Sequence, residues 1–257
     1  NMSQRVRDWN ASSTRLPPSY SLAMRSSLMR FPHAIALWCV LISCVACNPA
    51  TRSAPVAPPV NTADLAIASD AAADSLLADI RALDPTIVVT LRYATSDNFT
   101  GASLPGYLGN RALLRREAAA ALARVQRRLR PDGLGIKVFD AYRPVRATLA
   151  MVEWTRRVNR PDLLDNGYIA SRSRHNLGLA IDCTLIDLGS GRELEMGTPF
   201  DTFSSAAHTA NASGVAAVNR QKLKTAMESE GFVNYDQEWW HFSFDVPNPV
   251  RFDRVID

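Results

Sequence analysis

The chain has 257 residues, of which 47% are hydrophobic and 21% are charged, a composition that excludes a fibrous or disordered protein and predicts one globular domain with extra segments at an end. Five of the 29 basic residues but only one of the 25 acidic residues precede Cys47, so 24 of each remain after it and the formal charge of +4 belongs to the N-terminal part. This neutral body lacks the basic surface of a nucleic-acid-binding protein, and we expect no nucleic-acid partner.

Residues 1–47 are predicted to be a signal or lipoprotein-type targeting segment with an upstream extension. The apolar run 34–46 is about 13 residues long, which suits a signal-peptide core and is too short to cross a bilayer comfortably. The small residues before Cys47 resemble a bacterial lipoprotein processing site, at which the cysteine is lipidated. Cys44 stands where a leucine is usual, so ordinary secretory cleavage is an alternative.

This segment predicts where the protein resides. We expect an exported, periplasmic protein whose one link to the membrane is a lipid anchor on Cys47. If the N-terminal segment does not belong to the protein, a cytoplasmic location is expected instead.

Residues 48–68 are rich in Pro, Ala and Ser and predict a flexible tether. Three of the four cysteines fall in the targeting segment, which leaves Cys183 as the one thiol of the folded body and rules out a disulfide framework there. Cys183 lies in an apolar run, so we expect a buried, inert thiol.

The folded domain is predicted over residues 69–257, with elements that follow from apolar periodicity and from helix breakers. In chain order we expect a helix over 74–83, a strand over 86–93, an Ala- and Arg-rich helix over 110–130, a strand over 134–142, a helix over 145–158, a strand over 177–187, a helix over 222–230 and a final strand over 238–245. Pro85 ends the first helix, Pro144 opens the third and Gly231 closes the last. The pattern lacks βαβ alternation and predicts a single α+β domain with a mostly antiparallel central sheet flanked by helices.

The stretch SRSRHNLGLAID, residues 171–182, concentrates polar groups beside an apolar strand. His175 lies in its polar turn, and Asp182 lies among apolar strand residues. Burying an unpaired carboxylate costs several kcal/mol, so Asp182 needs a cation or several hydrogen-bond donors. A loop cap or an ion pair with an arginine would also satisfy it.

Two more polar residues, Glu238 and His241, lie in EWWHF, residues 238–242. Taken alone, this pattern is also that of a packed terminal strand. With His175 and Asp182, however, His241 completes the three nitrogen and oxygen ligands of a catalytic Zn²⁺ site, whose fourth position is left for water. We therefore predict one Zn²⁺ per chain and expect Glu238 to accept a proton from the water and return it to a leaving amine. His208, in a stretch predicted to be a loop, is the rival ligand.

Six motifs occur in the order seen in one peptidase family. They are RYATSDNFTG, LPGY, FDAYRP, SRSRHNLGLAID, MGTPFD and EWWHF, and they span nearly all of the folded domain. Together they resemble the zinc D-Ala-D-Ala dipeptidases of the vancomycin-resistance type, whose fold class also contains zinc D-alanyl-D-alanine carboxypeptidases and the hedgehog signalling domain. The pattern SxHxxGxAxD followed by EWWH is the specific part of this resemblance.

The resemblance implies roles for individual residues. It makes His175, Asp182 and His241 the zinc ligands and Glu238 the general base. It also makes Arg143 the group that stabilises the tetrahedral intermediate, although a structural pairing with Asp140 is an alternative. The residues it places near the ends of the dipeptide are Ser173, Tyr93, Tyr107 and Asp201. Two features depart from the family pattern: residues 202–214 hold one histidine where the resistance enzyme has two, and the lipoprotein-like N-terminus is additional.

The predicted activity is hydrolysis of D-Ala-D-Ala, a small-molecule substrate, to free D-alanine. An exported enzyme would not meet a dipeptide made in the cytoplasm, so salvage or turnover of cell-wall dipeptides is expected; a cytoplasmic location would instead restore a resistance role. One alternative is a D-alanyl-D-alanine carboxypeptidase acting on muropeptides, distinguished by whether the cavity is closed beyond the substrate amine. Another is a catalytically silent zinc module that binds peptidoglycan, although Glu238 and Arg143 would then be superfluous. The oligomeric state is left open.

Overall fold

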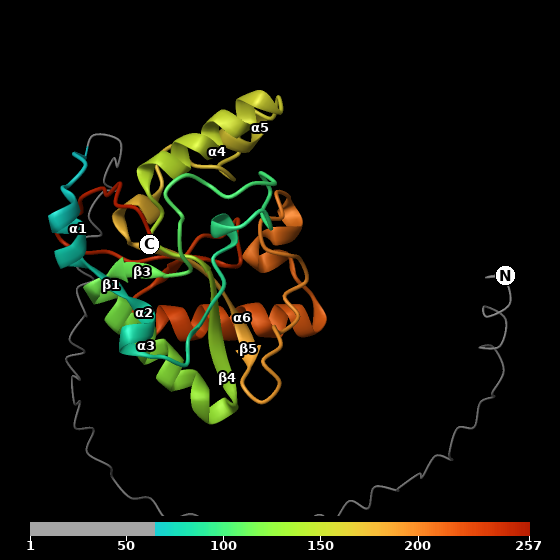
Figure 1. Cartoon of the computed structure of the whole chain (residues 1–257). Coiled ribbons are helices and arrows are strands. Elements are labelled where there is room, and N and C mark those ends of the chain that lie inside the picture. The colour runs from blue at the N-terminus through green and yellow to red at the C-terminus, as the bar shows by residue number, and fades with distance from the viewer. Residues whose placement is uncertain (1–64) are drawn as a thin grey trace, which may run out of the picture. The chain divides into compact units, whose positions relative to one another are not determined.

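A computed structural model describes residues 65–257 of the chain (Figure 1). The predicted targeting segment and most of the predicted tether lie outside the described residues. The last residues assigned to the tether, 65–68, run beside Arg251, whose carbonyl accepts a hydrogen bond from the backbone N of Ala68 at 2.8 Å. Within the described part of the chain, no helix combines the length and the apolar character needed to cross a membrane.

A five-stranded sheet forms the centre of the domain, in the order β2-β4-β5-β7-β6. Its strands are β2 (Val88–Val89), β4 (Leu134–Asp140), β5 (Ala180–Asp187), β7 (His241–Ser243) and β6 (Val233–Asn234). All neighbouring pairs are antiparallel except β2 and β4, which run parallel. The predicted α+β class with a mostly antiparallel sheet is confirmed. One parallel crossover, from β2 to β4, was not predicted.

Helices and a small second sheet surround this centre. The helices are α1 (Asp70–Leu76), α2 (Ile80–Leu83), α3 (Arg116–Leu129), α4 (Val145–Arg157), α5 (Asp162–Asp165) and α6 (Gly214–Glu228), and the second sheet pairs β1 (Leu77–Asp79) with β3 (Leu113–Arg115). Figure 1 shows α3 and α6 together at the central sheet. Each contacts one of its two long strands: α3 contacts β4, and α6 contacts β5. Buried side chains such as Leu122, Ile136, Leu185 and Leu223 form the core between them.

Two predicted helices are wrong in part, because the small sheet interrupts them. The helix expected over 74–83 divides into α1 and α2, with β1 between them. The helix expected from residue 110 begins only at Arg116, because β3 precedes it. Leu77 pairs with Arg115 across these strands, so tertiary pairing overrides a local helix preference that both segments carry. Asp79 then starts α2 by accepting a hydrogen bond from the backbone N of Arg81 at 3.0 Å.

Other boundaries follow the predictions more closely. Strands β4 and β5 and helix α4 form where they were expected, and Pro144 directly precedes α4. Helix α6 begins at Gly214 instead of residue 222. The strand expected over 86–93 is limited to β2, followed by the 3-10 turn η2 (Arg92–Ala94).

The final strand is also shorter than expected, because residues 238–240 form a turn before β7. Trp239 and Trp240, which the prediction placed in the strand, therefore lie in this turn instead. Both are buried, at 3% and 1% exposure, with ring centroids 5.3 Å apart in an edge-to-face arrangement. Trp239 is held in this turn by its backbone N, which donates to the Ala207 carbonyl at 3.1 Å.

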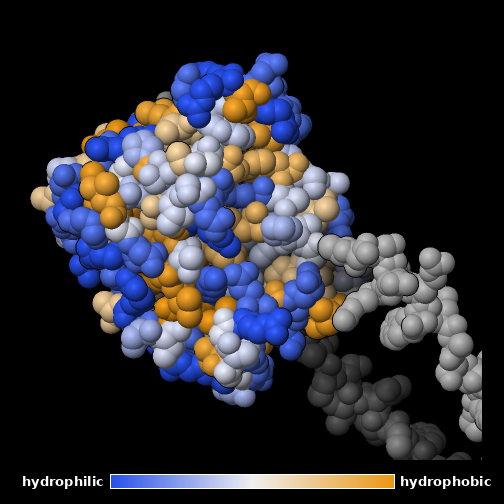
Figure 2. All heavy atoms as spheres, turned by 45° about the vertical axis from the view of Figure 1, so that its right-hand side comes forward, coloured by the Kyte–Doolittle hydropathy of each residue, from blue (hydrophilic) through white to orange (hydrophobic). Residues whose placement is uncertain are grey.

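The face drawn in Figure 2 shows no simple division into polar and apolar halves. On the face drawn in Figure 2, apolar side chains are interspersed with hydrophilic ones. Exposed apolar side chains do occur on α6, where Val215 and Val218 are 63% and 55% exposed. Scattered exposure of this kind is ordinary for a folded protein and indicates no function by itself.

Candidate active site

His175 lies in the 3-10 turn η4 (Arg174–Leu177), whose two ends are set by its neighbours. The Ser173 hydroxyl caps the turn by accepting a hydrogen bond from the backbone N of His175 at 3.2 Å. Gly178 ends the turn with φ +64°, and a Cβ there would lie 2.6 Å from a methyl carbon of Leu77. Glycine is therefore required both by the left-handed backbone and by the available space.

Asp182 and His241 come from adjacent strands of the central sheet. They are direct cross-strand partners of the antiparallel pair β5 and β7, so their side chains leave the sheet on the same side. Asp182 is 3% exposed and His175 is 2% exposed, while His241 is partly accessible. Segments far apart in the sequence thus place two imidazoles and one carboxylate together.

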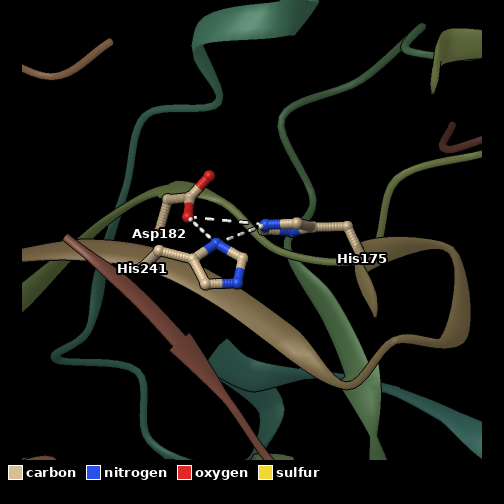
Figure 3. A group of neighbouring side chains, drawn as sticks. All are labelled: His175, Asp182 and His241. Atoms are coloured by element: carbon tan, nitrogen blue, oxygen red, sulfur yellow. Dashed lines mark hydrogen bonds and ion pairs between the residues drawn. The ribbon is translucent and has the colours of Figure 1, made fainter. Parts of the chain in front are cut away.

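The three side chains point toward one another (Figure 3). His241 Nδ1 lies 2.9 Å from Asp182 Oδ1 and 3.2 Å from His175 Nε2, and the last two atoms are 3.4 Å apart. Among residues 65–257 this is the one group of at least three His, Cys, Asp or Glu side chains whose ligand atoms are close enough to share a metal ion.

The hydrogen bonds around this group leave lone pairs directed at one point. His175 Nδ1 lies 2.6 Å from the Ala141 carbonyl oxygen. Because a carbonyl can only accept, Nδ1 carries the proton and Nε2 offers a lone pair. Asp182 Oδ1 is also an acceptor. Such converging nitrogen and oxygen acceptors, with one imidazole oriented from behind, fit a bound Zn²⁺.

Glu238 and Arg143 stand beside this group. The Glu238 carboxylate is buried, with Oε2 3.9 Å from His241 Nδ1. Arg143 Nε donates to Asp140 Oδ2 at 2.9 Å, and its Nη2 lies 2.7 Å from the same oxygen and 3.8 Å from Asp182 Oδ2. Arg143 therefore pairs with Asp140 and faces the cavity at the same time, so its two predicted roles are compatible.

These groups line a cavity of about 330 Å³. Its walls contain the predicted ligands, catalytic residues and three of the four predicted substrate-binding residues, namely His175, Asp182, His241, Glu238, Arg143, Ser173, Tyr93 and Asp201. The Tyr93 hydroxyl donates to Asp201 at 3.1 Å, which fixes that carboxylate in the wall.

Tyr107 does not line this cavity, which departs from the expected position near the dipeptide. Its hydroxyl donates to Asp140 Oδ1 at 2.6 Å, and Asp140 in turn holds Arg143. Tyr107 therefore contacts Asp140, which holds Arg143. The geometry does not support the expectation that Tyr107 lies near the ends of the dipeptide.

Charges in the cavity perturb one another. Burial alone would raise the pKa of Asp182, but the attraction and the hydrogen bonds of His175 and His241 bring it well below its usual value. Burial, followed by repulsion from Asp182 and Asp201, raises the pKa of Glu238 well above its usual range. Burial and the Asp182 charge likewise raise the pKa of Asp201. Burial lowers the pKa of His241. Burial and mutual repulsion thus disfavour the charged forms of Glu238 and Asp201, which a bound cation would favour.

His208, the rival ligand, is not part of the cluster. Its Nε2 lies 3.3 Å from the Tyr168 hydroxyl, and its backbone falls between two short 3-10 turns, η5 (Ser205–Ala207) and η6 (Thr209–Asn211).

Asn176 is a supporting residue that was not predicted: its Nδ2 donates to the Arg143 carbonyl at 2.8 Å. Its position directly after His175 in SRSRHNLGLAID was an available signal.

A cluster of this composition in an α+β domain, with a glutamate and an arginine in the same cavity, defines a metallopeptidase-type site. Residues 74–253 match the family model described as D-Ala-D-Ala dipeptidase, and the chain belongs to this family. The predicted family resemblance and the prediction of an enzyme are confirmed.

Several individual proteins are similar to the chain. D-alanyl-D-alanine dipeptidase of Enterococcus faecium is 36% identical over 175 residues, covering 62% of this chain and 86% of the relative. The enzyme of the same name from Escherichia coli K12 is 32% identical over 183 residues, covering 70% of this chain and 90% of the relative. A solved structure of a vancomycin-resistance D,D-dipeptidase with a D-Ala-D-Ala phosphinate analogue is 17% identical, with 66% of each chain covered and a TM-score of 0.37.

Proposed function

We propose that this protein hydrolyses D-Ala-D-Ala to D-alanine and that its metal is Zn²⁺. The observation that carries the proposal is the convergence of His175 Nε2, Asp182 Oδ1 and His241 Nδ1, all within 4.8 Å of one another, in a chain of the D-Ala-D-Ala dipeptidase family. Two imidazoles and one carboxylate are a ligand set of catalytic zinc sites, which keep one position open.

The chain's own residues account for the proton transfers and the charge stabilisation. A Zn²⁺ ion held by the three ligands would supply an acidified water and polarise the peptide carbonyl. Glu238, whose buried carboxylate lies beside His241, would accept the proton of the attacking water and pass it to the leaving D-alanine amine. Arg143, held in place by Asp140, faces the carbonyl oxygen as that oxygen gains negative charge.

The charged ends of the dipeptide have candidate partners in the same walls. Asp201, oriented by the Tyr93 hydroxyl, suits the substrate ammonium, because a cation beside this carboxylate would offset its repulsion from Asp182. Ser173 lines the same cavity two residues before His175. It suits the substrate carboxylate, because its hydroxyl can donate a hydrogen bond.

The cavity favours a dipeptide over a longer muropeptide. Its volume of about 330 Å³ is at the small end of ligand sites. Three aromatic side chains from separate loops pack together in its wall: Phe99 and Phe203 have ring centroids 5.1 Å apart, and Tyr168 and Phe203 6.0 Å apart. A carboxypeptidase would need this wall to open for the rest of the peptide.

A direct assay tests the proposal. We expect the metal-loaded protein to hydrolyse D-Ala-D-Ala, to leave L-Ala-L-Ala intact, to act far more slowly on a pentapeptide ending in D-Ala-D-Ala, and to lose activity with a chelator. Faster turnover of the pentapeptide would make the protein a carboxypeptidase. Binding of D-Ala-D-Ala with no hydrolysis of any of these peptides would leave a silent zinc module.

We also propose that the enzyme is an exported lipoprotein that salvages cell-wall dipeptides. The support is the sequence alone: the apolar run 34–46 ends at Cys47, in the manner of a lipoprotein processing site. Cys47→Ser should then release the protein from the membrane fraction or block its maturation. Unchanged membrane fractionation of the variant would mean that Cys47 carries no anchor.

A further inference from the structure

Asp140 is a completely buried carboxylate next to the active-site cavity. It ends β4 and is the register partner of the proposed metal ligand Asp182 on β5, because the pairing of the two strands shifts between Val138 and Asp140. A bulge of this kind changes the direction of the side chain that follows it. Two carboxylates directly opposite each other repel, so their positions depend on the groups that lie between them.

Arg143 is the cation between these two carboxylates. Its Nη2 lies 2.7 Å from Asp140 Oδ2 and 3.8 Å from Asp182 Oδ2, and its Nε donates to Asp140 Oδ2 at 2.9 Å. Two nitrogens of one planar group thus contact a single oxygen of Asp140. The direction in which the guanidinium points therefore follows the direction of the Asp140 carboxylate.

The backbone of Arg143 is fixed independently of Asp140. Its N donates to the His175 carbonyl at 3.1 Å, and its carbonyl accepts a hydrogen bond from Asn176 Nδ2 at 2.8 Å. The Tyr93 ring lies 5.0 Å from the guanidinium carbon and covers one face of the group. Asp140 therefore controls the aim of the guanidinium and not the path of the chain.

Tyr107 holds the other oxygen of the Asp140 carboxylate. Its hydroxyl donates to Asp140 Oδ1 at 2.6 Å, and both side chains are buried. Burial, followed by repulsion from Asp140, raises the pKa of Tyr107 well above its usual value, so the hydroxyl keeps the proton that it donates. Asp140 thus uses Oδ1 for the tyrosine and Oδ2 for the arginine, and it cannot turn without losing one of these contacts.

The C-terminal segment of the chain fixes the backbone that carries Tyr107. Tyr107 forms a parallel bridge with the buried Ile256. The backbone N atoms of Leu108 and Gly109 donate to the Ile256 carbonyl at 2.8 and 3.0 Å, and the Ile256 N donates to the Gly106 carbonyl at 2.8 Å. A hydroxyl at the end of a rigid ring on an anchored backbone has little freedom, which suits a group that positions another.

We propose that Tyr107 is a positioning residue for the hydrolysis: its hydroxyl fixes the Asp140 carboxylate, which in turn directs the Arg143 guanidinium at the peptide carbonyl oxygen. This inference rests on the function proposed above, and it replaces the expectation that Tyr107 lies near the dipeptide. A residue that acts through Arg143 stabilises charge that develops only in the transition state, so its loss lowers kcat and leaves KM unchanged. A residue that contacts the bound dipeptide would raise KM instead.

Tyr107→Phe removes the hydroxyl and keeps the ring. We expect kcat for D-Ala-D-Ala to fall about tenfold, KM to stay within about twofold and the zinc content to stay at the wild-type value, because the freed carboxylate lets the guanidinium move. Tyr142→Phe is the matched control, since Tyr142 is also buried but its hydroxyl donates to the Arg254 carbonyl at 2.8 Å. It should keep kcat and KM within about twofold of the wild type.

A double variant separates positioning from a general loss of packing. In the Arg143→Lys background, Tyr107→Phe should lower kcat by less than about twofold, because the planar group that Tyr107 positions is already absent. A purely structural effect of the missing hydroxyl would cost about tenfold in both backgrounds. Steady-state kinetics and metal analysis of the four proteins of this cycle give the answer.

The outcomes separate this inference from the proposed function. A metal-loaded wild type that does not hydrolyse D-Ala-D-Ala would overturn the proposed function and this inference with it. With an active wild type, four results would overturn this inference alone: equal kcat of Tyr107→Phe and Tyr142→Phe, a raised KM with unchanged kcat in Tyr107→Phe, loss of its zinc, or the same loss of kcat in both backgrounds.

Discussion

Asp182 and Thr184 are two residues apart on one strand, face the same side and are both buried, yet their surroundings differ completely. The Asp182 carboxylate has His241 at 2.9 Å, His175 at 3.4 Å and Arg143 at 3.8 Å. The Thr184 hydroxyl has no partner in the described part of the chain. Burial of a polar group therefore does not itself define a chemical site. The number and the charge of the groups that converge on it do.

The difference extends to the whole of each cavity. The active-site cavity brings the carboxylates of Asp182, Asp201 and Glu238 together, and their mutual repulsion makes a cation favourable. In the neighbouring cavity, which Thr184 and Phe139 line, the carboxylates of Asp187, Glu193 and Glu195 instead each have a separate hydrogen-bond or ion-pair partner. Carboxylates that converge on one point thus favour a bound cation, whereas carboxylates with separate partners do not need one.

The strongest test of this contrast removes a metal ligand. His241→Ala should abolish stoichiometric zinc binding and lower kcat/KM by about four orders of magnitude or more, while the fold persists, because two of three ligands cannot hold the ion. Zinc content by mass spectrometry and hydrolysis of D-Ala-D-Ala measure both effects. His208→Ala is the matched control and should retain both; a zinc-replete, active His241→Ala would contradict the ligand assignment.

A second change leaves the metal group intact and removes the proton acceptor beside it. Glu238→Gln should lower turnover by roughly two to four orders of magnitude with zinc retained and the dipeptide still bound, because the amide keeps the shape but cannot accept a proton. Steady-state kinetics combined with metal analysis measures this. Wild-type turnover of the variant would show that Glu238 is not the base.

A third change tests Arg143, the cation that lines the active-site cavity beside Asp182. Arg143→Lys keeps the charge but loses the planar group that contacts Asp140, so kcat should fall by about 10²–10³ with little change in zinc content. Arg146→Lys is a suitable control, since Arg146 forms an exposed ion pair with Asp253 at 2.9 Å. If both variants lose the same amount of activity, the effect is not specific to the cavity.

The smallest expected effect is on stability and concerns Thr184, the uncharged residue of the comparison. Thr184→Val removes an unpaired buried hydroxyl and should leave the free energy of unfolding unchanged or raise it by up to about 1 kcal/mol. Thr155→Val loses the hydrogen bond that an equally buried hydroxyl donates to the Val152 carbonyl at 2.7 Å, and should lower it by about 1 kcal/mol. Urea unfolding of the two variants gives the difference. Equal destabilisation would mean that the Thr184 hydroxyl has a partner after all.

Features with a strong local cause were predictable from the sequence. Strand β4 and helix α4 follow from uninterrupted apolar patterns and from Pro144, and these depend on short-range sterics. The proposed ligands stood out because a histidine and an aspartate beside an apolar run are costly to bury unless they are paired with a cation or with hydrogen-bonding groups. The structure brings His175, Asp182 and His241 together as the pattern suggested.

The tertiary structure decided what depends on partners distant in the chain. The segments of β1 and β3 each carry a helical pattern, and only their pairing makes them strands. The pattern of residues 238–240 predicts a strand, but the backbone N of Trp239 donates a hydrogen bond to the Ala207 carbonyl and the chain turns there. Tyr107 contacts Asp140 instead of the cavity, and Thr184 faces a cavity built by a loop that follows it. Local sequence determines which conformations a segment can adopt and which chemistry a side chain offers, whereas long-range packing selects one conformation and supplies or withholds each partner, because burial energy depends on neighbours from the whole chain.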